Sequence, residues 1–584
     1  MTLPTTRTPS QSSAGKVEEI IDDGLEKSRP QSLNNAKRPI WKRVLVGDAN
    51  QGNETKRAMQ SRHLTMIALG GTIGTGIFLS AGSAVALAGP GSALLSYFTV
   101  GVFCYGVVIS LGEMAAYIPV TGSFAEFGTR FVSPALGFTL GWNYWLQCEL
   151  TAAAVILQYW DPNIKPWKYA LMIIFPIFMM QLIHVRVYGE SEYWFAMIKI
   201  IMIIVFIFVG LIYDWGGVRG HPVLTFCDLP SCATQGLANF QAGQAFIGGF
   251  GNFAQTFVFA FYSYGGVELV TLAAGESASP HKSVPRAVRA TFLRILIFYI
   301  LTILTIGLCI NNQDPTLLTA ANDSSVAASP LTVVFVRAGF GAAVHVVNAV
   351  LLTAVLSATN SCFYASSRML LALARHGQAP RVFGWVNSRG VPVPSLVLSL
   401  AISFISFLTT IWGEGVVFTW LISLTGISAL LVWGTIGAIS LRFRAAWKAQ
   451  GRTVEDLPYV QPLYPALPLL TVGLAVAMLA AEGYASVVKQ PFDWRNIIAT
   501  YVGVVVFIAT YVGWTAYELL WLRKRQHFVP IMEVDLDTDA VWRPGDGARV
   551  REEDQAARDK RDAQDLAEGR RWRVWARSVL RYIA

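Results

Sequence analysis

Long stretches of apolar residues, separated by short polar joins, run through most of this chain. No Asp, Glu, Lys or Arg occurs within residues 64–112, 390–413, 415–441 and 496–517. A helix needs about 20 predominantly apolar residues to cross a bilayer. We therefore predict an all-α membrane protein with twelve spans, at residues 64–89, 92–118, 135–160, 167–185, 191–213, 246–274, 291–311, 341–373, 394–412, 415–441, 463–488 and 496–522.

The composition leads to the same class of protein. Of the 584 residues, 53% are hydrophobic and 14% are charged, whereas an ordinary soluble protein has about 25% charged residues. This low charge density excludes a soluble enzyme, a disordered regulator and a disulfide scaffold. A β-barrel is disfavoured because the apolar runs are continuous and longer than the roughly ten residues of a transmembrane strand.

The charges in the polar joins predict how the chain is oriented in the membrane. Basic residues gather in the even-numbered joins, which include Arg286, Arg289, Arg442 and Arg444. Short joins rich in Lys and Arg stay in the cytoplasm, so both termini are expected there. Residues 1–62 are then a disordered cytoplasmic tail, residues 63–522 a membrane domain and residues 523–584 a second tail. The net charge of +9 reports this topology and does not call for a nucleic-acid partner.

The first predicted span contains an unusual cluster of glycines. Four glycines and two threonines fall within residues 70–76, and each glycine in a helix interior costs about 1 kcal/mol relative to alanine. The cluster permits an unwound segment in the membrane, which is tolerable only where it lines a cavity. Freed N–H groups suit a carboxylate, and freed carbonyls suit an ammonium group or a cation. Close packing of small residues between helices is the alternative explanation.

The sixth span has a second weak point. Ser263, Tyr264, Gly265 and Gly266 interrupt its apolar sequence and are followed by Glu268. Breaks in spans one and six are the spacing expected if spans one to five and six to ten are inverted repeats. Paired broken helices at matching positions indicate the binding site of a secondary transporter.

Several sequence runs, in order, resemble a known family. They are GGTIGTGIF, GEMAAYIPVTGSF, YGGVELVTLAAGE, ESASPHKSVPRAVR, LSATNSCFYASSRMLLALARHGQAP and RFRAAWKAQGRTVEDLPY. Over about residues 58–525 the chain resembles the fungal amino-acid permeases, a branch of the amino acid–polyamine–organocation superfamily. The resemblance implies a LeuT-like 5+5 inverted repeat with helices one and six broken. It also implies a multi-pass plasma-membrane permease for L-amino acids, driven by proton symport.

The resemblance also assigns roles to residues at the two breaks. Backbone amides of Gly74, Thr75 and Gly76 correspond to those that hold the substrate carboxylate. Carbonyls near the breaks correspond to those that hold the α-amino group, and here they belong to Thr72, Ile73, Tyr262, Ser263 and Gly265. The expected substrate-binding set also includes Tyr264. Such a site recognises the part that all amino acids share.

Charged residues inside spans are expensive in a membrane and usually functional. Glu268 corresponds to a family glutamate linked to proton response and gating, although capping of freed backbone groups is an alternative. Lys199 is expected about 12 Å along a helix starting near Ser191. By resemblance, Lys199 occupies the place that a sodium ion fills in sodium-coupled relatives, touches the first break and exchanges a proton. A purely structural role, in which Lys199 pairs with another residue, is the alternative.

Other candidates for the pocket are less well defined. Glu149 in the third span is a candidate for the side-chain pocket, where it would favour basic substrates. The chain is several residues shorter than its relatives in that span, which leaves the alignment of Glu149 open. Ser357 and Asn360 in the eighth span either line the pocket or make helix-to-helix contacts. Glu113 and Glu126 are expected to pair with nearby basic residues.

The outer joins and the tails carry further signals. Cys227 and Cys232 share an outer join and either form a small disulfide or stay as free thiols. Asn322 begins a glycosylation sequon in another outer join. By resemblance, exposed lysines in the first tail are candidates for ubiquitin-ligase adaptors, namely Lys16, Lys27 and Lys37. The last fifteen residues either form a helix on an anionic membrane face or are disordered.

These features favour a secondary transporter of broad range, with an L-amino acid as substrate, a proton as coupling ion and the lipid bilayer as its environment. No GxxxxGK[ST] motif indicates ATP drive, and the seven scattered histidines make no HExxH pair, so we expect no cofactor, no metal and no enzymatic activity. Two alternatives stay open. One is a narrower permease for basic, acidic or proline-type substrates, and the other is a transporter-like amino-acid sensor.

Overall fold

The computed structural model describes residues 55, 57–71, 73–74, 76–145, 166–215, 239–240, 244–314, 329–403, 414–488, 494–523, 527–542 and 546–583. The chain divides into compact units at residues 1–51 and 52–584, and every described residue lies in the second. Regular structure in these residues is helical, with one isolated β-bridge between Met59 and Ser277. The predicted all-α class is confirmed.

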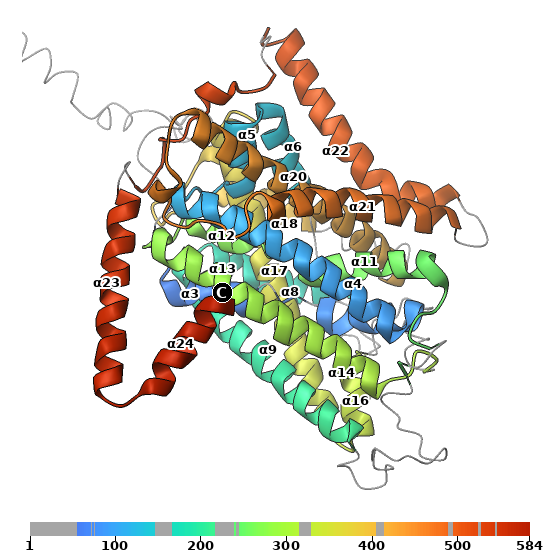
Figure 1. Ribbon diagram of the computed structural model, residues 1–584. Coiled ribbons are helices and arrows are strands. Elements are labelled where there is room, and N and C mark those ends of the chain that lie inside the picture. Colours follow the sequence, from blue (N-terminus) through green and yellow to red (C-terminus); the bar gives the residue numbers. More distant parts are fainter. Residues whose placement is uncertain are drawn as a thin grey trace, which may run out of the picture. The chain divides into compact units, whose positions relative to one another are not determined.

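A helix lies within each of the twelve predicted spans (Figure 1). The helices in the first half of the chain are α3 (Ser61–Met66), η3 (Ile67–Gly71), α4 (Gly76–Tyr117), α5 (Ser123–Phe131), α6 (Pro134–Trp145), α8 (Pro166–Gln181), α9 (Val185–Asp214), α11 (Gly249–Tyr264), α12 (Leu269–Ala274), α13 (Pro280–Arg294), η4 (Ile295–Ile300) and α14 (Leu301–Cys309). The later helices are α16 (Pro330–Arg337), α17 (Ala343–Arg375), η5 (Arg381–Gly384), α18 (Val393–Ser403), α20 (Glu414–Ala449), η7 (Val454–Asp456), α21 (Ala466–Val488), α22 (Trp494–Leu520), η8 (Ile531–Glu533), α23 (Asp546–Ala567) and α24 (Arg571–Ile583).

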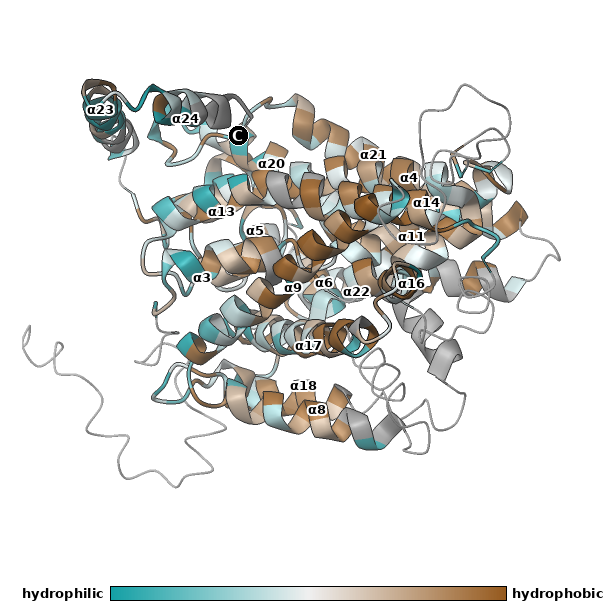
Figure 2. Ribbon diagram, turned by 90° about the horizontal axis from the view of Figure 1, so that it is seen from below, coloured by the Kyte–Doolittle hydropathy of each residue, from teal (hydrophilic) through white to brown (hydrophobic). Residues whose placement is uncertain are grey.

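Seven helical stretches in the described part of the chain are long and apolar enough to cross a membrane: Ser80–Tyr117, Val185–Asp214, Gly249–Ala274, Val344–Arg375, Gly426–Ala449, Ala466–Val488 and Tyr501–Leu520. Large apolar side chains on α9 are nonetheless exposed, among them Trp194, Ile201 and Phe208. Figure 2 shows the hydrophobic colour along α9 and α14, with hydrophilic residues on α3, α13 and α23. Exposed apolar faces of this kind suit contact with lipid tails, so the chain is a multi-pass membrane protein.

The boundary between the first two predicted spans lies inside α4. Gly89 has a φ of 84° and is followed by Pro90, so α4 consists of two helices that meet at a kink. Only glycine suits this position, because an added Cβ would lie 2.5 Å from the carbonyl oxygen of Gln244 and L-residues avoid that φ.

Both predicted helix breaks are present. The first span runs from α3 into the π-helical turn η3, and the α-helix resumes at Gly76. The sixth span stops at the end of α11 and resumes with α12, with residues 265–268 in a turn between them and Gly266 at a φ of 87°. Helices α4 and α11 pack side by side (Figure 1), which brings the two breaks together.

The tail after the last predicted span folds back onto helix ends. We call residues 527–542 the C-terminal strap. The backbone N–H of Val541 donates to the carbonyl of Tyr117 at the end of α4 (3.0 Å). The guanidinium of Arg452 donates to Asp537 in the strap (2.7 Å). The sequence predicts only a polar tail for this region.

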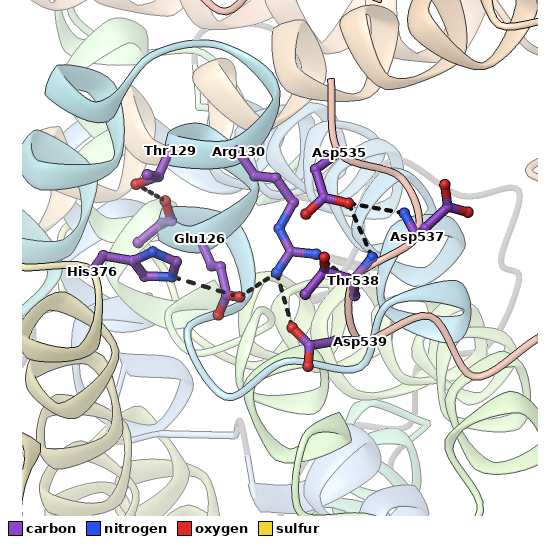
Figure 3. A network of polar contacts seen from close by, with 9 residues as sticks. Glu126, Thr129, Arg130, His376, Asp535, Asp537, Thr538 and Asp539 are labelled. Atoms are coloured by element: carbon purple, nitrogen blue, oxygen red, sulfur yellow. Dashed lines mark hydrogen bonds and ion pairs between the residues drawn. The ribbon is translucent and has the colours of Figure 1, made fainter. Parts of the chain in front are cut away.

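Arg130 on α5 forms hydrogen bonds with the middle of the strap (Figure 3). Its guanidinium donates to the carbonyl oxygen of Thr538 (2.6 Å), to Asp539 (3.0 Å) and to Glu126 on its own helix (2.9 Å). Nε2 of His376 lies 3.6 Å from the same Glu126 carboxylate. The expected pairing of Glu126 with a basic residue is confirmed.

A turn in the strap is held by Asp535, whose carboxylate accepts the backbone N–H groups of Asp537 and Thr538 (3.0 Å each). Partial burial raises the pKa of Asp535, but the hydrogen bond from the Thr538 hydroxyl, the two backbone hydrogen bonds and the charge of Arg130 together outweigh it, so the net pKa lies below its usual value. A lowered pKa stabilises the folded turn above the ordinary carboxyl pKa, and this contribution is lost as the pH falls through the lowered value.

Glu113, at the end of α4, makes the second expected pair. Both of its oxygens accept from the Arg444 guanidinium on α20 (2.7 and 2.8 Å), and the backbone N–H of Gln461 donates to it as well (2.8 Å). Glu113 and Arg444 are buried, so this bidentate pair ties α4 to α20 where both leave the apolar region.

Replacing Leu536 by aspartate is expected to release the strap. Leu536 and Val534 are 1% and 3% exposed, and removal of a buried leucine alone costs about 2–5 kcal/mol. Limited proteolysis within the strap of the detergent-purified protein should then run at least about tenfold faster. Met532→Asp is the control, because Met532 is 64% exposed in the same strap. Equal cleavage rates for the two variants would show that the strap is not docked.

Candidate functional site

The two helix breaks meet backbone to backbone. A Cβ added to Gly76 at the start of α4 would lie 2.4 Å from Cα of Ser263 and 2.7 Å from its backbone nitrogen. Real Cβ atoms do not approach other atoms so closely, so glycine is required at this contact. Ser80, one turn along α4, donates its hydroxyl to the Gly76 carbonyl (2.8 Å). The glycine cluster therefore serves close approach of two segments as well as unwinding.

Ser263 is fixed by several hydrogen bonds. Its hydroxyl lies 2.7 Å from the Tyr97 hydroxyl and 3.4 Å from that of Ser80, and it donates to the carbonyl of Phe259 (2.9 Å). The carbonyl of Ser263 accepts from the Tyr299 hydroxyl (3.0 Å). One lone pair of that carbonyl is thus already engaged within the protein.

Tyr264 packs on the two tyrosines that bond Ser263, namely Tyr97 and Tyr299. Its hydroxyl donates to the carbonyl of Tyr97 (3.0 Å), and its ring stacks on Tyr299 with centroids 4.0 Å apart. The side chain is fully buried. Tyr264 therefore anchors the end of α11 against α4 and η4.

Lys199 makes the contact with the first break that was expected of it. Its ammonium group donates to the carbonyl oxygen of Ile73 (2.7 Å) and to the hydroxyl of Ser357 on α17 (2.8 Å). The side chain is fully buried. Because α9 begins at Val185 and not near Ser191, Lys199 lies about 21 Å along its helix, deeper than the sequence analysis placed it.

The structure adds Glu192 to this site, a residue that the sequence analysis did not single out. Glu192 is fully buried. Its carboxylate accepts from the hydroxyl of Ser357 (2.6 Å) and from the amide of Asn360 (2.8 Å). Placing the start of the span at residue 191 put Glu192 at the membrane surface, whereas its spacing of seven from Lys199 indicates the same helix face.

Glu268 is the last residue of the turn at the second break and is 2% exposed. The indole N–H of Trp433 on α20 donates to its carboxylate (3.1 Å), and the Tyr144 hydroxyl on α6 lies beside it. Within α12 the side chain makes no capping hydrogen bond. Glu268 therefore connects the second break to α20 and α6.

The predicted site residues fall into two groups. Those that the structure describes are Ile73, Gly74, Gly76, Lys199, Tyr262, Ser263, Tyr264, Gly265, Glu268, Ser357 and Asn360. Gly76 meets Ser263, Lys199 joins Ile73 to Ser357, and Asn360 is connected to Ser357 through Glu192. Six predicted residues lie outside the described residues: Thr72, Thr75, Glu149, Cys227, Cys232 and Asn322. In the part of the chain that the structure describes, no group of His, Cys, Asp and Glu is arranged to hold a metal ion.

Comparison with known proteins shows to which family the chain belongs. Residues 63–527 match the amino acid permease family. The chain belongs to that family. It is 40% identical over 487 residues to the lysine-specific permease LysP of Escherichia coli (strain K12), covering 82% of this permease and 96% of LysP.

Two further relatives are matched over most of their length. The histidine permease HisP of Lactococcus lactis is 39% identical over 495 residues, covering 83% of this permease and 99% of HisP. The general amino acid permease AGP3 of Saccharomyces cerevisiae is 34% identical over 490 residues, covering 82% and 84%. These relatives are bacterial as well as fungal, and they are transporters. The permease is therefore an amino-acid transporter and not an enzyme.

Proposed function

We propose that this permease takes up L-amino acids together with protons, over a broad range of substrates. The observation that carries the proposal is the contact between the two broken helices, with the buried ammonium of Lys199 on the first break. We further propose twelve spans in a LeuT-like 5+5 inverted repeat, since a helix lies in each predicted span and the breaks fall in spans one and six.

The two ends of the zwitterion are proposed to meet opposite helix ends. The amides of Gly74, Thr75 and Gly76 lie at or before the start of α4, and a helix start favours a carboxylate. The end of α11 offers the carbonyls of Tyr262 and its neighbours, which favour the α-amino group. Such a site binds the shared part of every amino acid and leaves the side chain to other walls.

Two buried ionisable groups are proposed to couple transport to protons. Lys199 touches the first break directly, and Glu268 follows the second. A charge buried in a membrane helix is expensive unless it is paired or can be neutralised. Proton movement at Lys199 would alter its hydrogen bond to the Ile73 carbonyl, and movement at Glu268 would alter its bond to Trp433.

The remaining assignments are proposed together. The permease lies in the plasma membrane of a fungus, with both tails cytoplasmic, residues 63–522 as the transport domain and tail lysines as sites for ubiquitin-ligase adaptors. Residues in the outer joins supply a disulfide between Cys227 and Cys232 and a glycan at Asn322, and Glu149, Ser357 and Asn360 contribute to the pocket. These assignments follow from the loop charges and the family resemblance.

A narrower range for basic amino acids is a second candidate. Two of the relatives are named for lysine and histidine, which favours substrates with a basic side chain. Competition of unlabelled arginine, histidine, glutamate, proline and leucine against labelled lysine uptake in expressing cells separates the two. If the permease has a broad range, all five amino acids compete with labelled lysine. Competition by arginine and histidine alone would establish the narrower range for basic amino acids. Absence of all uptake despite surface expression would contradict transport and favour a sensor.

A further inference from the structure

Glu192 is the buried carboxylate closest in the hydrogen-bond network to Lys199. One hydroxyl stands between them: Lys199 Nζ to Ser357 Oγ is 2.8 Å, and Ser357 Oγ to Glu192 Oε2 is 2.6 Å. The two charged residues are seven positions apart on α9, about 10 Å of helical rise. Ser357, from α17, fills the gap between them, and all three side chains are fully buried.

The carboxylate is held in a fixed orientation. Its second oxygen accepts from the Asn360 amide (2.8 Å), and the Asn360 amide oxygen accepts in turn from Gln181 on α8 (2.8 Å). The hydroxyl of Ser361 on α17 also hydrogen-bonds this carboxylate, and Glu192 Oε2 faces the Ser357 hydroxyl at 2.6 Å. A fixed donor–acceptor line at these distances is the geometry that proton transfer through a hydroxyl requires.

The ionisable groups around Glu192 come from several elements. Among the described residues, α9 itself contributes Lys199 and Tyr188. Helix α17 contributes Tyr364 and Arg368, which lie further along it. Helix α3 contributes His63, but that side chain pairs with Glu190 and not with Glu192. Arg368 is paired with Glu276 (3.2 Å). Helix α8 contributes only the amide of Gln181, and α14 meets α9 near Gly210, about five turns away. Lys199 is therefore the counter-charge that faces Glu192.

We propose that Glu192 is the proton acceptor for Lys199, with the Ser357 hydroxyl as the bridge. This inference rests on the proposed function and assigns a further residue to its coupling machinery. In the transfer, an N–H bond of the Lys199 ammonium breaks as Ser357 Oγ takes the proton, and the Ser357 O–H proton passes to Glu192 Oε2. An ammonium and a carboxylate become an amine and a carboxylic acid, so the number of protons and the net charge are unchanged.

The transfer has a consequence at the substrate site. While Lys199 is charged, its ammonium donates strongly to the Ile73 carbonyl (2.7 Å), because charge-assisted hydrogen bonds are the stronger ones. With the proton on Glu192, the neutral amine is a weaker donor, and the Ile73 carbonyl becomes available to the α-amino group of a substrate. Glu192 would thus connect proton position with substrate binding at the first break.

Two variants in proteoliposomes test the relay, with labelled lysine as the probe. Glu192→Gln removes the acceptor, and Ser357→Ala removes the bridge but keeps both charged groups. For each variant, we expect uptake driven by a pH gradient to fall at least about tenfold and to lose its pH dependence. Exchange of labelled for unlabelled lysine without a gradient should fall at least about threefold less than gradient-driven uptake in the same variant, because exchange moves no net proton.

Glu190→Gln is the matched control. Glu190 lies two positions away on α9, is 36% exposed and pairs with Arg62, so this variant should keep the wild-type pH profile. A wild-type pH profile in Ser357→Ala, or in a stably inserted Glu192→Gln, would overturn the relay. A parallel loss of uptake and exchange in Ser357→Ala would overturn it in favour of a structural role. If Glu192→Gln fails to insert, Ser357→Ala decides alone. Absence of uptake by the wild type would instead overturn the proposed function.

Discussion

Changing Gly76 to alanine is expected to reduce amino-acid uptake about 100-fold while the protein still reaches the membrane. The added Cβ would lie 2.4 Å from Cα of Ser263, whereas carbon atoms pack at about 3.5–4.0 Å. The two breaks must separate by roughly 1 Å, and a displacement of that size in a site can cost about 100-fold. Helix folding itself tolerates alanine, so the loss should appear in uptake and not in abundance.

The control for this variant is Gly473→Ala. Gly473 lies within α21, and a Cβ there would meet nothing within 4 Å, so uptake should stay close to the wild type. Surface labelling of both variants in intact cells reports abundance alongside uptake. If Gly76→Ala transports as well as Gly473→Ala, the breaks do not meet as described and their assignment to the substrate site fails.

Changing Lys199 to methionine is expected to have an effect of similar size. The variant loses the hydrogen bonds to the Ile73 carbonyl and to Ser357, and it leaves the buried Glu192 carboxylate without its counter-charge. Removal of one partner of a buried pair costs about 3–5 kcal/mol of stability, so the state in which the first break is assembled becomes rare and uptake through it is expected to fall about 100-fold. Uptake of labelled lysine under a pH gradient is the measurement.

Lys168→Met is the control for this prediction, since Lys168 is an exposed lysine on α8 and its loss should leave uptake near the wild type. The double variant Lys199→Met with Glu192→Gln adds a second check. Because the glutamine removes the uncompensated charge, the double variant should be no worse than Lys199→Met alone. Additive losses, or full activity of Lys199→Met, would contradict the pairing.

The sequence was sufficient to locate both helix breaks. Glycines in clusters weaken a helix, and their placement in spans one and six gave the region in which α3, η3 and α4, and then α11 and α12, are interrupted. The charge pairs of Glu113 and Glu126 were also predictable, because carboxylates at span ends lie near basic joins. Local composition determines these features, and distant parts of the chain are not needed to infer them.

Other features depend on contacts that composition does not report. Glu192 was overlooked because the span was started at residue 191, whereas α9 begins at Val185 and buries it. The strap was overlooked because its buried residues, Val534 and Leu536, alternate with acidic ones and match no long apolar pattern. The packing of Tyr264 on Tyr299 likewise depends on a tertiary contact that its place in the chain does not report.

The central claim is that a pH gradient drives amino-acid uptake through the paired breaks. The most direct test uses purified permease in sealed proteoliposomes with labelled lysine outside. With an acidic exterior and a more alkaline lumen, we predict accumulation above the external concentration, collapse when a protonophore is added, and no accumulation in Gly76→Ala. Uptake that only equilibrates lysine, and that is unchanged by the gradient or the protonophore, would contradict the claim.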